Sequence, residues 1–164
     1  MPKRTLYIAR HAKSSWDDPT LSDFARPLNK RGERDAPFMA QLLKAKRVLP
    51  QLILSSPAKR AKTTAAIYHD AIKGELRFDE RIYDTSAMSL LYLVQEVLSD
   101  SDHESLMLVG HNPGLTELSN ILSNKYISNI PTAAVVAIDF EDQIAPKQGK
   151  QRFFEYPKMY RDLY

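Results

Sequence analysis

The stretch "LYIARHAKSS", residues 6–15, joins a short apolar run to two basic side chains. Residues 6–9 do not alternate between apolar and polar, which is typical of a strand covered on both faces. Arg10 and His11 follow directly. A basic pair at the exit of a strand belongs either to an ordinary polar loop or to a functional site. The positions of the other predicted strands and helices help to decide between a polar loop and a functional site.

Similar apolar runs alternate with segments of helical periodicity. Further strands are predicted at residues 52–54, 106–109 and 133–138, and "QRFFEYP" (151–157) is expected to add a last, antiparallel strand at an edge. Helices are predicted at residues 30–46, 57–72 and 89–98, and another from His111 onward. Alternating strands and helices predict an α/β fold in three layers, α/β/α, with a mainly parallel central sheet.

Length and composition are those of one soluble domain spanning residues 1–164. Of the 164 residues 43% are hydrophobic and 26% charged, with no internal repeat or low-complexity linker. The absence of cysteine excludes a disulfide framework, a thiol nucleophile and cysteine-ligated zinc. No run is long enough for a secretory leader or a membrane span, so we expect a cytoplasmic protein that does not insert into membranes.

The net charge of +3 gives little support to a nucleic-acid partner. The 23 basic residues are intermixed with 20 acidic ones, and no zinc-finger, helix-turn-helix or RNP-like motif is present. We therefore expect no nucleic-acid binding.

Three segments bring basic or imidazole side chains to the ends of predicted strands. Arg10 and His11 follow the first strand, Arg60 lies in the first turn of the helix after the second, and His111 follows "LMLVG". In open α/β sheets ligands bind outside the carboxyl ends of the strands, so these four side chains are predicted to share one rim. Ser56 is the expected N-cap of the Arg60 helix, with Pro57 as its first helical residue.

The chemistry of these groups is suited to a phosphoryl group. Two arginines offer bidentate donors to tetrahedral oxyanions, and a helix N-terminus adds oriented N–H groups. Two imidazoles can serve as nucleophile, acid, base or charged donor. His69, within a helix, and His103, in the polar loop "SDSDHES", are interpreted as structural or solvated.

The motifs "RH", "SSPAKRAKTTA" and "VGHNPGL" resemble those of the histidine phosphatase superfamily, whose fold is phosphoglycerate mutase-like. The small size and "RPLNKRGERDA" look closest to its SixA-type phosphohistidine phosphatases. This resemblance implies that His11 is the nucleophile and that Arg10, Arg60 and His111 bind the phosphoryl oxygens, with Arg26 adding a further contact. Many relatives have glycine where this chain has Ala12, which requires an ordinary φ there.

A mechanism follows from these roles. Neutral His11 presents an unprotonated ring nitrogen, its other nitrogen donates to a backbone carbonyl, and Arg10 and Arg60 lower its pKa. The arginines and a cationic His111 hold the equatorial oxygens while the phosphoryl group moves to His11. Water then hydrolyses the phosphohistidine, so no metal or other cofactor is expected.

The proton donor stays open. Relatives use either a Glu after the third strand or an Asp after the second His, and that second position is Asn112 here. Glu80, in "RFDERIYD", is the remaining candidate, although it can equally be a solvated carboxylate. A phosphohistidine substrate has less need of a donor, because its imidazole is a fairly good leaving group.

The short connections predict an open site that admits a phosphorylated protein, with "KSSWDDPTLSDFA" (13–25) as one wall. The alternatives are a phosphatase or mutase for a small phosphorylated metabolite, and a catalytically inactive interaction domain. The presence of all four core residues argues against the last.

Overall fold

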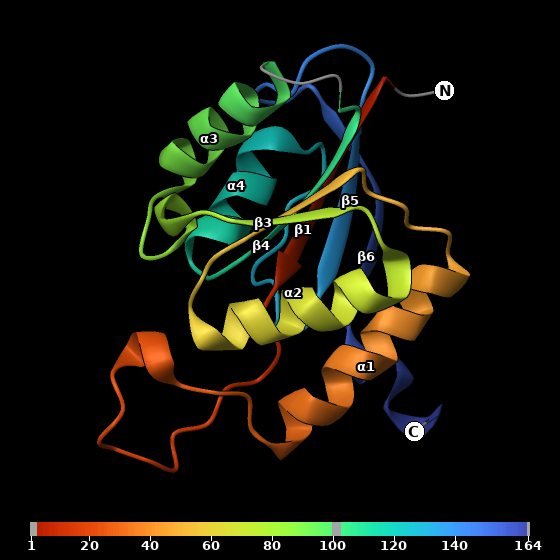
Figure 1. The fold of residues 1–164 in the computed structure, drawn as a ribbon. Coiled ribbons are helices and arrows are strands. Elements are labelled where there is room, and N and C mark those ends of the chain that lie inside the picture. The colour runs from red at the N-terminus through yellow and green to blue at the C-terminus, as the bar shows by residue number, and fades with distance from the viewer. Residues whose placement is uncertain (1–2, 100–102, 164) are drawn as a thin grey trace.

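The computed structural model describes residues 3–99 and 103–163. Figure 1 shows the chain as alternating strands and helices. In chain order, the main elements are β1 (Arg4–Arg10), α1 (Lys30–Ala45), β2 (Leu52–Ser55), α2 (Lys59–Ile72), β3 (Glu75–Phe78), α3 (Ala87–Ser99), β4 (Ser105–Gly110), α4 (Gly114–Leu122), β5 (Val135–Phe140) and β6 (Gly149–Glu155). Short 3-10 helices are η1 (Asp23–Ala25), η2 (Glu80–Ile82) and η3 (Pro157–Leu163).

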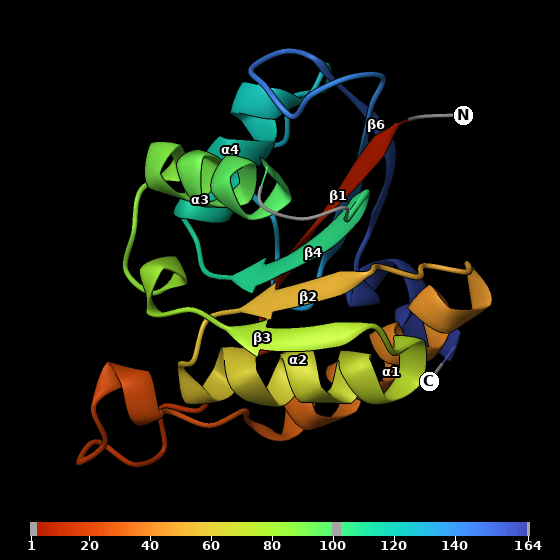
Figure 2. The same ribbon diagram turned by 45° about the horizontal axis from the view of Figure 1, so that its top comes forward.

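One six-stranded sheet forms the middle layer, in the order β3-β2-β4-β1-β5-β6. The strands β1 to β4 pair in parallel, whereas β5 pairs antiparallel with both β1 and β6. Figure 2 shows α1 and α2 on one face of the sheet and α3 and α4 on the other. The predicted three-layer fold is confirmed, as is the antiparallel edge strand at the end of the chain.

Alternate residues of β1 pack into two separate hydrophobic cores. Leu6 and Ile8 pack in the cluster beneath α3 and α4, whereas Tyr7 and Ala9 pack in the cluster beneath α1 and α2. Successive side chains of a strand point to opposite faces, so a central strand with both faces covered must be apolar throughout. This explains why residues 6–9 carry no alternation.

Two features differ from the sequence prediction. The helix α2 begins at Lys59 with Ala58 as its N-cap, so Ser56 is not the cap and Pro57 precedes the helix. The Ser56 hydroxyl instead accepts from the Ala58 N–H at 3.2 Å. The strand β3 is not among the predicted strands, because it is an edge strand whose residues are mostly exposed and form no apolar run.

The parallel topology places the carboxyl ends of β1, β2 and β4 side by side. Arg10 at the end of β1 is in register with Gly110 of β4, and Ser55 of β2 is in register with Val109. The loops that leave adjacent strands therefore begin one strand spacing apart, about 5 Å, with the β4 loop between those of β2 and β1. None of the helices within the described ranges is long and apolar enough to cross a membrane.

A close approach between backbones anchors the loop after β1. Lys13 O accepts from Asn29 N at 3.0 Å, and an added Cβ at Gly32 would lie 2.2 Å from the same oxygen. Only glycine lets the first turn of α1 approach this loop so closely. The glycine of "NKRGERD" is thus explained by packing against the chain that follows His11.

We expect Gly32→Ala to lower the free energy of unfolding by about 1–3 kcal/mol, because the methyl group meets backbone atoms that cannot rotate away. Chemical denaturation of the variant beside Lys30→Ala, an exposed position in the same turn, measures this. Equal stability of the two variants would contradict the packing explanation.

Candidate active site

His11 lies at the exit of β1 with only 6% of its surface exposed. Its Nδ1 is 2.7 Å from the Ala12 carbonyl oxygen, which can only accept, so Nδ1 carries the ring proton. Its Nε2 accepts from the Arg60 Nε–H at 3.4 Å. The imidazole is therefore fixed as the tautomer whose lone pair on Nε2 faces Arg60.

The backbone around His11 is held from three sides. The His11 N–H donates to Gly110 O at 3.2 Å, and His11 O accepts from Ala133 N at 3.0 Å. The Ala12 N–H donates to Thr64 Oγ1 at 3.0 Å. Ala12 is fully buried and does not have a positive φ, so its methyl group packs into the core without strain.

Burial is the largest cause of the low pKa of His11, which falls from 6.5 to about 3. The charges of His111, Arg60 and Arg10 lower this pKa further, whereas the hydrogen bond to Ala12 opposes them. The neutral imidazole expected from the sequence is thus explained by desolvation first and by the neighbouring cations second.

His111 follows β4 and stands against His11, with 5.1 Å between the ring centroids. Burial, followed by the charge of Arg60, lowers its pKa from 6.5 to about 4. The cationic His111 predicted for the site that holds a phosphoryl group stays a prediction, because without such an anion burial and the charge of Arg60 favour the neutral ring. The same desolvation that keeps His11 neutral acts on its neighbour.

Ser56 holds the His111 ring in place. The Ser56 Oγ lies 2.8 Å from His111 Nε2, and it already accepts from the Ala58 N–H. Donation of the buried hydroxyl proton to Nε2 gives that proton an acceptor and leaves the imidazole proton on Nδ1. The local pattern predicts a helix cap at Ser56 because it carries no sign of a partner 55 residues away.

His11, His111, Arg10 and Arg60 form the cluster of the candidate site. Two of its buried polar atoms lack a partner among the described residues. They are Arg10 Nε and His111 Nδ1. The Arg10 Nη1 donates to Ile130 O at 2.9 Å, which fixes the guanidinium while its Nε stays unpaired. Because buried donors are normally satisfied, these atoms fit a site that accepts an oxyanion. Arg60, 6% exposed in the first turn of α2, adds a third donor group.

Arg26 is buried next to the cluster, but its contacts lie within its own loop. It donates to Ser14 Oγ at 2.9 Å and to Asp23 Oδ1 at 3.2 Å, and its guanidinium carbon lies 3.5 Å from the centroid of the Trp16 ring. Asp23 also pairs with Arg60 at 3.0 Å, so Arg26 reaches the cluster through this shared carboxylate. Its role as a phosphoryl ligand stays a prediction.

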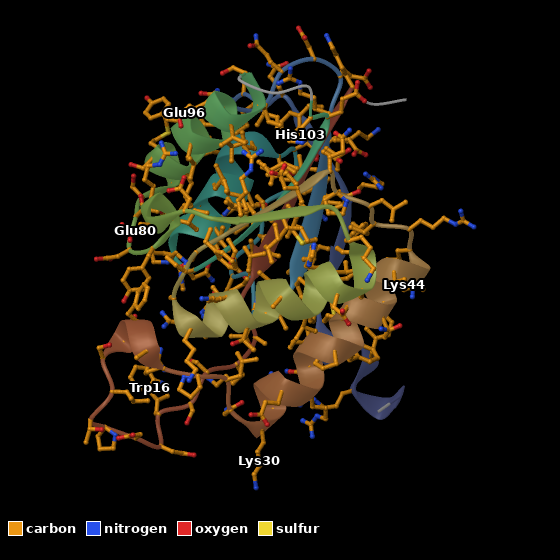
Figure 3. All side chains as sticks on the ribbon, viewed as in Figure 1. Trp16, Lys30, Lys44, Glu80, Glu96 and His103 are labelled. Carbon is orange, nitrogen blue, oxygen red and sulfur yellow. The ribbon has the colours of Figure 1, made fainter. Side chains whose placement is uncertain are left out.

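Glu80 opens η2 and is exposed. Its side chain makes no hydrogen bond or ion pair with any residue that the structure describes, and Figure 3 shows it at the outer margin of the molecule. Unlike that of Glu80, the side chain of Tyr83, three residues later, contacts the cluster. Its ring stands edge-on to His111, with 5.4 Å between centroids.

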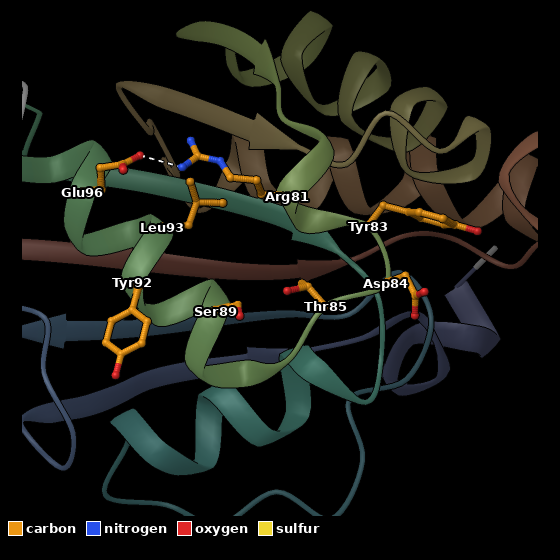
Figure 4. A pocket seen from close by; sticks show the side chains of 8 residues that line it. All are labelled: Arg81, Tyr83, Asp84, Thr85, Ser89, Tyr92, Leu93 and Glu96. Atoms are coloured by element: carbon orange, nitrogen blue, oxygen red, sulfur yellow. Dashed lines mark hydrogen bonds and ion pairs between the residues drawn. The ribbon is translucent and has the colours of Figure 1, made fainter.

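A pocket of about 430 Å³ lies between this segment and α3 (Figure 4). Its lining residues are Arg81, Tyr83, Asp84, Thr85, Ser89, Tyr92, Leu93 and Glu96. Figure 4 shows the Tyr83 ring at one end of the pocket, directed away from the side chains of α3. Tyr83 thus both lines this pocket and contacts His111.

The remaining histidines lie outside the cluster. His69 Nε2 is 3.0 Å from Gly74 O, and His103 Nε2 is 3.8 Å from a Glu75 carboxylate oxygen. Within residues 3–99 and 103–163, no group of three or more His, Asp or Glu side chains is arranged to hold a metal ion.

Two facing imidazoles and two arginines thus lie at the carboxyl edge of the α/β sheet. This arrangement is typical of proteins that bind a tetrahedral anion beside a histidine. Residues 6–113 match the model of the histidine phosphatase superfamily, branch 1. The chain belongs to this family.

Individual relatives agree with this placement. An uncharacterized chloroplastic protein of Arabidopsis thaliana is 38% identical over 133 residues, covering 76% of this chain and 61% of its own length. The structure of SixA from Agrobacterium tumefaciens superposes with a TM-score of 0.81 at 27% identity, covering 94% of this chain and 99% of that one. The protein histidine phosphatase SixA complexed with tungstate has a TM-score of 0.82 at 20% identity, covering 94% and 98% of the two chains.

The two depressed histidine pKa values make stability depend on pH. Between pH 6.5 and about 4, these two histidines are protonated in the unfolded chain but stay neutral in the folded protein. A falling pH therefore favours the unfolded state. We expect the free energy of unfolding to fall as the pH is lowered from 7 to 5. Urea denaturation at several pH values measures the slope.

The variants His11→Asn and His111→Asn should each flatten this slope, with His69→Asn as the control for removing a histidine outside the cluster. A slope that survives in the double variant His11→Asn/His111→Asn would contradict this assignment.

Proposed function

We propose that this chain is a phosphatase that acts through a phosphohistidine on His11, and that its substrate is a phosphohistidine in another protein. The observation that carries the proposal is the tautomer of His11. A buried neutral imidazole, with its Nδ1–H donated to the Ala12 carbonyl and its Nε2 lone pair beside the donors of Arg60, is a nucleophile prepared for phosphoryl transfer.

In the first step, the substrate displaces the Arg60 Nε–H from Nε2, and the freed lone pair forms a bond to phosphorus while the bond from phosphorus to the leaving nitrogen or oxygen breaks. The electron pair of the broken bond goes to the leaving group, and a leaving imidazole departs as a neutral ring when its other nitrogen carries a proton. Arg10, Arg60 and the Nδ1–H of His111 donate to the three equatorial oxygens. These donors carry most of the catalysis, because phosphoryl transfer depends mainly on positioning and charge stabilisation. An anionic phosphoryl group also favours protonation of His111, which would restore the expected cation once substrate is bound.

In the second step, a water oxygen bonds to phosphorus and the phosphorus–Nε2 bond breaks. One water proton stays on the phosphate and the other passes to solvent. The electron pair of the broken bond returns to Nε2, so His11 is again neutral and inorganic phosphate is the product. Every atom is supplied by substrate, water and His11. The reaction as proposed needs no metal ion.

The carboxylate in contact with the cluster supports a phosphohistidine substrate. The hydrogen bond from Tyr83, together with Arg60 and Arg26, lowers the pKa of Asp23 to about 2. Asp23 therefore has no proton to give an alkoxide leaving group at neutral pH. The imidazole of a phosphohistidine leaves without strong protonation, and the neighbouring SixA structures make such a substrate the favoured class.

We expect His11→Ala to lose turnover by about 10³-fold or more, because no other group accepts the phosphoryl unit. A panel of phosphohistidine protein, phosphoramidate and sugar phosphates, with and without EDTA, measures activity, with His69→Ala as the matched control. Wild-type protein should also trap acid-labile, alkali-stable phosphate on His11.

Equal activity of the wild type and His11→Ala would contradict the assignment of His11 as the nucleophile. Loss of turnover in EDTA, reversed by added metal, would refute metal independence. Preference for sugar phosphates would favour the alternative of a small phosphorylated metabolite.

Ser56→Ala should lower kcat by about 10- to 100-fold, since His111 loses the group that fixes its ring and tautomer. Ser55→Ala is the matched control, because the neighbouring buried hydroxyl donates to backbone carbonyls. Steady-state kinetics of both variants on phosphoramidate provides the test. Equal kcat values in the two variants would show that the Ser56 contact has no part in the reaction.

A further inference from the structure

Asp23, in η1, makes an unusual set of contacts for a loop residue. Its Oδ2 accepts from the Tyr83 hydroxyl at 2.6 Å and from Arg60 Nη2 at 3.0 Å. Its backbone oxygen accepts from Arg60 Nη1 at 2.7 Å. Its other carboxylate oxygen accepts from Arg26 Nε. One residue therefore connects two arginines and a tyrosine that lie far apart in the sequence.

These contacts fix the orientation of Arg60. Both terminal nitrogens of its planar guanidinium bond to Asp23, and the remaining Nε–H is directed at His11 Nε2 at 3.4 Å. An arginine side chain has many rotamers, but a rigid fork held at both tips can present its Nε edge in only one direction. The geometry between Arg60 and the nucleophile is thus determined by Asp23.

The charge of Asp23 acts in two opposite ways. Arg60 is 6% exposed and close to Arg10, so a carboxylate beside it offsets the cost of burying this cation. With a pKa of about 2, Asp23 is ionised at any ordinary pH. The same negative charge repels a phosphoryl anion that approaches Arg60. Asp23 should therefore improve orientation while weakening the binding of anions.

We propose that Asp23 is the positioning residue of this site: it holds Arg60 in line with His11 for the transition state at the cost of ground-state phosphate affinity. Tyr83 acts indirectly, through Asp23, because its hydroxyl donates to the same Oδ2 that accepts from Arg60. This inference rests on the proposed phosphoryl transfer to His11. It adds a residue that neither touches the reacting atoms nor follows a predicted strand.

The test is Asp23→Asn, which keeps the side-chain shape and one oxygen acceptor but removes the charge. Asp17→Asn is the matched control, an exposed carboxylate six positions earlier in the same loop. For each protein we would measure kcat and KM on phosphoramidate, competitive inhibition by inorganic phosphate, and the melting temperature.

We expect Asp23→Asn to lower kcat by about 10- to 100-fold, as a small misplacement of a catalytic group does, while inorganic phosphate binds as well as or more tightly than to wild type. Tyr83→Phe, which leaves the carboxylate in place, should show a smaller loss of kcat. Asp17→Asn should match wild type in both measurements.

A kcat for Asp23→Asn within about twofold of the Asp17→Asn value would overturn the inference. So would a parallel loss of kcat, phosphate affinity and melting temperature, because that pattern marks a merely structural role. Wild-type protein without turnover would instead remove the proposed function, and this inference with it. An active wild type with an equally active Asp23→Asn removes the inference alone.

Discussion

The hydrogen bond from Arg60 Nε–H to Nε2 of His11 imposes a condition on the whole site. It requires a lone pair on Nε2, which in turn requires the ring proton on Nδ1 and a carbonyl acceptor such as that of Ala12. Burial maintains this state by holding the pKa of His11 at about 3. A protonated His11 would place two like charges in contact at low solvent exposure, which the surrounding groups could not offset.

A buried site rich in cations needs acceptors, and the chain supplies some of them from its backbone. The carbonyls of Ile130 and Asp23 each receive a terminal nitrogen of Arg10 or Arg60. Carbonyl groups orient a guanidinium without neutralising it, so the positive potential of the site is retained. The carboxylate of Asp23 is the ionised group that compensates Arg60 directly.

The sequence was sufficient to predict the fold class and the convergence of Arg10, His11, Arg60 and His111, because parallel strands end at the same rim and each of these residues lies close behind a strand. Ser56 and Asp23 could not be predicted in their observed contacts. Ser56 contacts His111 across 55 positions, and Asp23 contacts Arg60 across 37, from a loop without periodicity.

Two further features depend on contacts of the same kind. The charge of His111 depends on how completely the folded chain excludes water, which no local pattern records. The first turn of α2 starts later than the Ser–Pro signal indicates, because the Ser56 hydroxyl is engaged with Ala58 and His111 rather than with a free helix end. In both cases tertiary contacts override a correct local rule.

The stacking of Trp16 on Arg26 has a practical consequence. Trp16 is the one tryptophan among the 164 residues, it is 72% exposed, and its ring lies 3.5 Å from a guanidinium that shares Asp23 with Arg60. Indole emission responds to nearby charge and to solvent contact. The tryptophan fluorescence of this protein therefore originates beside its candidate site, so that ligand titrations can be followed without an attached dye.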